Sequence, residues 1–167
     1  MRAAVYRAPE TIVVEKLGMP EPKAGEALIR VRSAGICGSD LHVYHGKHPF
    51  VKPPRILGHE VTGDISAVGE GTEKSRFKIG DKVVADGLMT CGECPFCRSG
   101  HHNICESIKI LGIHIDGADA EFLRVPERLV HHLPDGMDYD EGALIEPASV
   151  ALHAVERCGV TEDDVVA

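Results

Sequence analysis

The sequence predicts a mainly β protein with a few helices, built as a barrel or sandwich of short strands. Turn residues recur roughly every ten positions up to Pro134, which is the spacing of short antiparallel strands. No apolar pattern of helical period lasts longer than two turns in that part of the chain. After Asp138 the pattern changes, and apolar residues at helical spacing run from Glu146-Pro147 to Gly159. One longer helix is therefore expected late in the chain.

The first strands are expected at residues 5–6, 11–16 and 26–33, where glycine or proline stands at the boundaries. Side chains of residues 26–33 alternate between two faces, as in a half-buried strand. Ser39 and Asp40 then predict the cap of a brief helix that ends at Gly46.

Later strands are expected at residues 61–68, 82–86, 108–115, 121–125 and 129–133. Gly63 lies inside the first of these and predicts a bulge or bend. Residues 165–167 are apolar and predict the start of another strand. Because an unpaired apolar edge is a liability, a chain that stops there indicates a fragment of a longer protein.

Composition excludes several classes of function. The net charge of −8, the absence of a Lys/Arg run and an aromatic content of 4% argue against a nucleic-acid partner. No apolar run approaches the roughly eighteen residues of a membrane span, so no membrane partner is expected. The amino terminus lacks the apolar core of a signal peptide. Six cysteines are then expected as metal ligands or reduced thiols, which indicates the cytoplasm.

The segment 91–105 is expected to form a lobe around a structural zinc ion. It carries four cysteines with gaps of two, two and seven residues, namely Cys91, Cys94, Cys97 and Cys105. Four thiolates complete a tetrahedron and leave no open position for chemistry. The bacterial iron–sulfur pattern would need a gap of three and a following proline, whereas Glu106 follows here. Two disulfides are the other alternative, disfavoured by the missing secretory signal.

A second group of metal-binding residue types precedes this lobe. Glycines flank Cys37 and permit close backbone approach, and Gly58-His59-Glu60 offers a nitrogen and an oxygen ligand. Each residue taken alone also has an ordinary explanation: a buried small side chain for Cys37, a satisfied polar group for His59 and solvated surface for Glu60.

Taken together, three motifs resemble the zinc-dependent medium-chain alcohol dehydrogenases over nearly the whole chain. They are Cys37-Gly38-Ser39-Asp40-Leu41-His42, Gly58-His59-Glu60 and the four cysteines of the lobe. The resemblance implies a GroES-like β-barrel catalytic domain at residues 1–155 and a connection at 156–167 into a Rossmann domain. That domain would bind NAD or NADP, and only its first strand would be present in this chain.

The resemblance also implies site residues. Cys37 and His59 would bind a catalytic zinc, and Glu60 and Glu146 would serve this metal, one of them through water. The stretch around Glu146 resembles sorbitol, xylitol and related polyol dehydrogenases, although a carboxylate at a helix amino terminus is the alternative. Cys158, near the end of the expected helix, is disfavoured as a ligand.

Three further residues have two explanations each. Ser39 and His42 stand three apart, which places them on one helix face, and the resemblance implies a proton relay. Alternatively, Ser39 caps the turn and His42 lies on the surface. Asp40 either orients the His59 ring through a hydrogen bond or caps the helix.

The expected function is hydride transfer between a secondary alcohol of the polyol or sugar class and NAD or NADP. Two zinc ions per chain and a homo-oligomer, dimer or tetramer, are implied by the resemblance. The 167-residue chain alone is expected to be inactive. An L-threonine 3-dehydrogenase is the alternative within the same fold, and a non-catalytic zinc-stabilised binding module is the alternative of another class.

Overall fold

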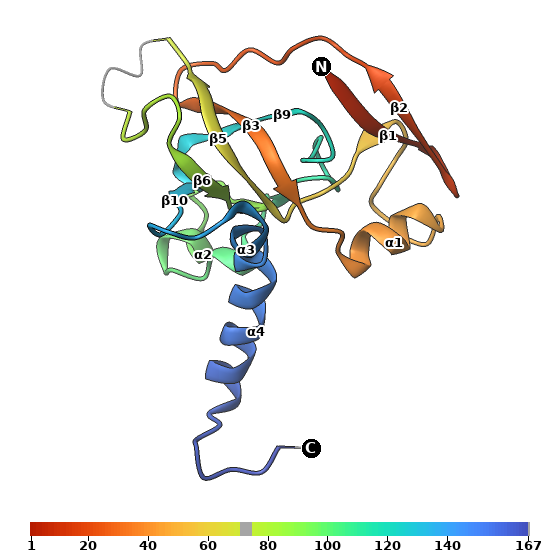
Figure 1. Ribbon diagram of the computed structural model, residues 1–167. Helices are drawn as coiled ribbons and strands as arrows, with labels where there is room; N and C mark the ends of the chain where they lie inside the picture. Colours follow the sequence, from red (N-terminus) through yellow and green to blue (C-terminus); the bar gives the residue numbers. More distant parts are fainter. Residues whose placement is uncertain (71–74, 167) are drawn as a thin grey trace.

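The computed structural model describes residues 1–70 and 75–166 (Figure 1). Its strands are β1 (Arg2–Ala8), β2 (Thr11–Lys16), β3 (Glu26–Ala34), β4 (Arg55–Ile56), β5 (Val61–Val68), β6 (Lys82–Ala85), β7 (Leu88–Met89), β8 (Lys109–Ile110), β9 (Phe122–Pro126) and β10 (Val130–His132). Its helices are α1 (Gly38–Tyr44), α2 (Pro95–Arg98), α3 (Tyr139–Ala143) and α4 (Ile145–Cys158), with 3-10 turns at His102–Ile104 and Glu127–Leu129. The mainly β prediction is confirmed.

The strands form antiparallel sheets around one principal core. A five-stranded sheet has the order β10-β6-β5-β3-β9, a three-stranded sheet has the order β2-β1-β4, and β7 pairs with β8. The largest core cluster draws fully buried side chains from β3, β5, β6, β9 and β10. Burial of each large apolar side chain stabilises the fold by about 1.5–3 kcal/mol. The described residues therefore contain a rigid platform from which loops can present a site.

Gly63 produces the irregularity that its position predicts. The pairing of β3 with β5 shifts between Val31 and Ser33, opposite Gly63. A Cβ atom on Gly63 would lie 2.1 Å from the carbonyl oxygen of Arg30, so only glycine permits this approach. Beyond the bulge the two strands still pair, and the amide of Gly35 donates to the carbonyl oxygen of Glu60 at 2.8 Å. The bulge thus helps to bring the two strand ends together.

The strand expected at residues 108–115 is wrong for most of its length. Only β8 is a strand, and the chain turns at Gly112, whose φ is 75°. A Cβ atom there would lie 2.7 Å from the backbone nitrogen of Gly58, so the chain bends against residue 58 instead of extending. The strand expected at residues 165–167 is also absent as far as the description reaches: 165 and 166 pair with no described strand, and 167 lies outside the described residues.

Helix α4 begins and ends where the sequence predicts, with Gly159 left-handed at its end. The preceding helix, α3, was not expected. Its position is set by β5: Thr62 Oγ1 donates to the Tyr139 carbonyl oxygen at 2.7 Å, and the Tyr139 hydroxyl donates to Asp64. These two hydrogen bonds fix the place of α3 and so the start of α4, which then extends away from the sheets (Figure 1).

The domain boundary expected at residue 155 stays a prediction, and α4 runs across it. In the described part of the chain, no helix combines the length and apolar character that a membrane crossing requires.

Candidate metal centres

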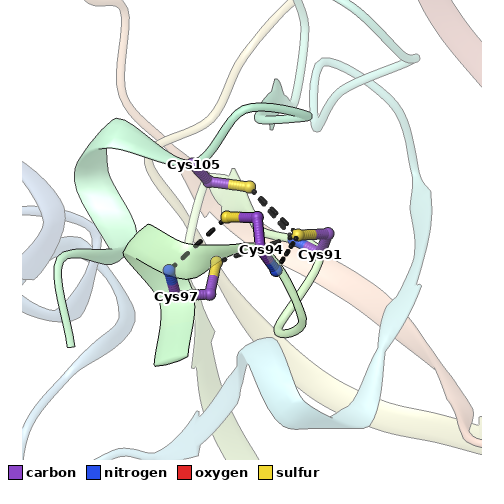
Figure 2. A group of neighbouring side chains, drawn as sticks. All are labelled: Cys91, Cys94, Cys97 and Cys105. Carbon is purple, nitrogen blue, oxygen red and sulfur yellow. Dashed lines mark hydrogen bonds between the residues drawn. The ribbon is translucent and has the colours of Figure 1, made fainter. Parts of the chain in front are cut away.

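The four cysteines of the lobe converge on one point (Figure 2). The Cys91 sulfur lies 3.9 Å from that of Cys97 and 3.5 Å from that of Cys105. A disulfide would need about 2.05 Å, so these pairs are not bonded. Thiolates held about 2.3 Å from zinc at tetrahedral angles are about 3.8 Å apart, which matches the observed spacing. The geometry therefore fits a metal and excludes the two-disulfide alternative.

Backbone amides point at these sulfurs. The amides of Cys91 and Ser107 donate to Cys105 Sγ at 3.3 and 3.4 Å, and the amide of Cys94 donates to Cys91 Sγ at 3.3 Å. Hydrogen bonds from the amides of Cys97 and Glu106 lower the pKa of Cys94 to about 6, so this thiol ionises near neutral pH. We refer to the set as the four-cysteine centre.

Within the four-cysteine centre, the pKa of Cys97 is raised whereas the pKa values of Cys94 and Cys105 are lowered. Burial and the adjacent sulfurs together raise the pKa of Cys97 to about 12, although the amide of Gly92 lowers it. The pKa of Cys105, in contrast, is lowered by the amide of Cys91. Four adjacent thiolates are therefore not stable on their own, and a cation in the middle would remove the conflict.

A second group of ligand types forms at the other motif. One ligand atom from each of Cys37, His59 and Glu60 lies within 4.8 Å of the other two. His59 and Glu60 are each 7% exposed and precede β5, whereas half-buried Cys37 immediately precedes α1. We refer to these three residues as the mixed centre. The structure thus brings together three of the residues expected to hold a catalytic metal.

Asp40 links α1 to the mixed centre. The cap position is Cys37, so the expectation that Ser39 caps this helix is wrong. Asp40 does help to cap it from the first turn, because its Oδ2 accepts from the Cys37 amide at 2.9 Å. Its Oδ1 lies 3.9 Å from His59 Nδ1. The capping role considered for Asp40 is therefore present, whereas its hydrogen bond to the imidazole stays a prediction.

Buried polar atoms in and next to the mixed centre lack hydrogen-bond partners, and this observation tests whether the site fits a metal. His59 Nδ1 and Asp40 Oδ1 are buried without a hydrogen bond. Leaving such atoms unsatisfied costs roughly 1–3 kcal/mol each. A cation bound by Cys37, Glu60 and the other ring nitrogen would acidify the imidazole and draw Nδ1–H toward Asp40. Sulfur, nitrogen and oxygen are the donors that zinc accepts, and three protein ligands leave an open position.

Glu146 approaches the mixed centre without joining it. Glu146 lies half-buried in the first turn of α4. The ligand atoms that lie close together belong to Cys37, His59 and Glu60, and Glu146 is not among them. Burial raises the pKa of Glu146, His59 lowers it and Glu60 raises it, so the three groups are electrostatically coupled. Glu146 also lines a cleft of about 320 Å³ together with Asp86. Direct ligation by Glu146 stays a prediction.

The expected relay residues lie on α1, three residues apart. Ser39 is half-buried and His42 is exposed, and in the described residues no hydrogen bond joins them. A role for either one stays a prediction. Cys158 lies exposed in the last turn of α4, away from both centres.

Gly35 lies against Glu60 of the mixed centre, and from the sequence it was selected only as a glycine near Cys37. A Cβ atom on Gly35 would lie 2.0 Å from Glu60 Oε2 and 3.1 Å from Glu60 Cδ. Asp119 is a second residue near this centre, and sequence reasoning missed it because its loop carries no motif. Burial and the negative charge of Asp40 raise the pKa of Asp119 to about 6, although His59 lowers it. Both are identified only by contacts between distant parts of the chain.

We expect Gly35→Ala in the full-length protein to weaken metal binding at the mixed centre about tenfold, within the range for disturbed metal surroundings. The added methyl group takes the place of the Glu60 carboxylate, which must rotate away. Gly38→Ala is the matched control, because nothing lies within 4 Å of a Cβ atom at this neighbouring position. Chelator competition measures both affinities. Equal affinities in the two variants would show that Glu60 has no fixed place in the centre.

Comparison with known proteins adds a family. Residues 23–135 match the alcohol dehydrogenase GroES-like domain. Sorbitol dehydrogenase of Bacillus subtilis is 39% identical over 100% of this chain and 48% of its own length. A zinc-type alcohol dehydrogenase-like protein of Haemophilus influenzae is 40% identical over 94% of this chain and 46% of its own length. An alcohol dehydrogenase of Escherichia coli CFT073, crystallised with NADH, has a TM-score of 0.91 at 36% identity, covering 99% of this chain and 48% of the other. The chain spans about half the length of the curated relatives it matches.

Proposed function

This chain belongs to the family of the alcohol dehydrogenase GroES-like domain, and from that premise we propose that it is the catalytic domain of a zinc-dependent dehydrogenase. The full-length protein would oxidise a secondary alcohol of the polyol or sugar class and reduce NAD or NADP. The observation that supports this most directly is a mixed, three-donor centre beside a separate four-cysteine centre. A scaffold stabilised by metal needs only the second of these.

In this proposal the four-cysteine centre holds a structural zinc and stabilises the 91–105 lobe. The mixed centre holds a catalytic zinc through Cys37, His59 and Glu60, and Glu146 serves the same metal from the start of α4. When bound, this zinc supplies Lewis acidity to the substrate oxygen. The nicotinamide cofactor would supply the hydride acceptor, and in this proposal a Rossmann domain of the full-length protein would bind most of it.

The residues of this chain would orient the substrate and carry its proton. Asp40 Oδ1, 3.9 Å from His59 Nδ1, would accept a hydrogen bond from the ring and orient it when metal is bound. Oxidation of an alcohol releases one hydride and one proton, and the proton must reach solvent. Ser39 would accept it and His42 would pass it on, since His42 is exposed and an imidazole exchanges protons near neutral pH.

The substrate class is supported by the carboxylates near the mixed centre. Glu60 and half-buried Glu146 are acceptors that can bind neighbouring hydroxyl groups of a polyol, either directly or through water. A relative named sorbitol dehydrogenase points in the same direction. Activity as an L-threonine 3-dehydrogenase is the second candidate within the fold. We further propose that the full-length protein is a homo-oligomer.

The decisive experiment combines metal counting with a substrate screen on the full-length protein. Polyols, sugars, sugar acids and L-threonine are each assayed with NAD and with NADP, and kcat/KM is compared. We expect two zinc ions per chain and the highest kcat/KM with a polyol or sugar. One zinc per chain and no oxidation of any alcohol would favour the non-catalytic binding module. Preference for L-threonine would support the proposed dehydrogenase and contradict the proposed polyol or sugar substrate.

A further inference from the structure

A third carboxyl group, that of Asp119, lies against the backbone that carries His59. A Cβ atom on Gly58 would lie 2.6 Å from Asp119 Oδ1, so glycine at position 58 is what lets the carboxyl group approach. The main chain of Asp119 is held on both sides. Its amide donates to the Leu57 carbonyl oxygen at 2.9 Å, and its carbonyl oxygen accepts from the Ala4 amide at 2.7 Å. The carboxyl group therefore has a defined place beside the mixed centre.

Asp119 is half-buried, and a second carboxyl group, that of Asp40, acts on it electrostatically. Burial and the negative charge of Asp40, which is 6% exposed, both raise the pKa of Asp119. His59 lowers it. Asp40 Oδ1 and His59 Nδ1 are buried without hydrogen bonds. Two carboxyl groups are thus gathered around one imidazole, an arrangement that a cation bound by that imidazole would stabilise.

We propose that Asp119 is a positioning residue of the mixed centre, which with Asp40 supplies negative charge next to the backbone that carries His59 and strengthens the binding of a divalent cation. The inference rests on the proposed metal-binding function of Cys37, His59 and Glu60. Asp119 acts through its neighbours and is not a member of the ligand group. Groups placed just outside metal ligands commonly change affinity about 10–100-fold.

The test is Asp119→Asn in the full-length protein. The amide has the size of the carboxyl group, so packing over Gly58 is kept while the charge is removed. The mixed centre is emptied by a chelator with zinc retained in the four-cysteine centre, and Co²⁺ is then titrated by its absorption, with Cys37→Ala as the blank. We expect Co²⁺ to bind about tenfold more weakly in Asp119→Asn. Asp135→Asn removes an equal charge at an exposed position and should leave the affinity unchanged.

Each other outcome overturns the inference in a distinguishable way. Equal Co²⁺ affinity in Asp119→Asn and in the unchanged protein would refute the positioning role and leave the proposed function standing. Absence of Co²⁺ uptake at the mixed centre of the unchanged protein would refute both. Weaker binding together with a lower melting temperature or loss of zinc from the four-cysteine centre would indicate a structural role for Asp119 instead.

Discussion

Replacing Cys37 by alanine in the full-length protein is expected to remove one of two zinc ions and to lower kcat/KM at least about 1,000-fold. Cys37 supplies the sulfur of the mixed centre, and only His59 and Glu60 would remain as its ligand group. Lewis acidity at the substrate oxygen is worth several kcal/mol in the transition state, which sets the size of this loss. Metal analysis and steady-state kinetics on the same sample measure both effects.

Cys158→Ala is the matched control for this variant. Cys158 is an exposed thiol in the last turn of α4 and belongs to neither centre, so its removal should change neither zinc content nor kcat/KM. A Cys37→Ala protein that keeps two zinc ions, or that stays within tenfold of the original activity, would contradict the assignment of the mixed centre. Retained zinc in the four-cysteine centre confirms that the variant is folded.

Features encoded within a few neighbouring residues could be predicted from the sequence. The four-cysteine centre is such a case, because its spacing alone brings the thiols into one lobe. The bulge opposite Gly63 and the end of α4 at Gly159 are two more, because each depends on what a single glycine permits. The alternation of residues 26–33 likewise identified β3.

Features that depend on pairing between distant segments could not be predicted. The chain turns at Gly112 because it packs on Gly58, more than fifty positions earlier, and this contact ends β8. Asp40 looked like either a helix cap or a partner of His59, since only the folded chain shows that its two oxygens face different neighbours. Asp119 had no motif at all. Its relation to the mixed centre exists only once the 118–119 backbone pairs with residues 57 and 58.

The second large effect is expected at the four-cysteine centre. Cys105→Ser should release zinc from that centre and lower the free energy of unfolding of the full-length protein by about 3 kcal/mol or more. Structural zinc contributes about 10–16 kcal/mol in small zinc domains, so its release from a lobe that is also held by hydrogen bonds and packing should cost at least about 3 kcal/mol. Cys105 also joins the two ends of the lobe, because its sulfur accepts from the amides of Cys91 and Ser107. Zinc content and denaturant unfolding are the measurements.

The mixed centre distinguishes a local effect of Cys105→Ser from general misfolding. Its three residues lie just before α1 and just before β5, whereas Cys105 lies in the lobe, so the mixed centre should still take up metal while the lobe is disordered. Cys158→Ser should leave both the unfolding curve and the zinc content unchanged, since an exposed thiol outside both centres holds no metal. If Cys105→Ser unfolds at the original denaturant concentration with two zinc ions bound, the sulfur at 105 is not a ligand, and the lobe is held by its hydrogen bonds and packing alone.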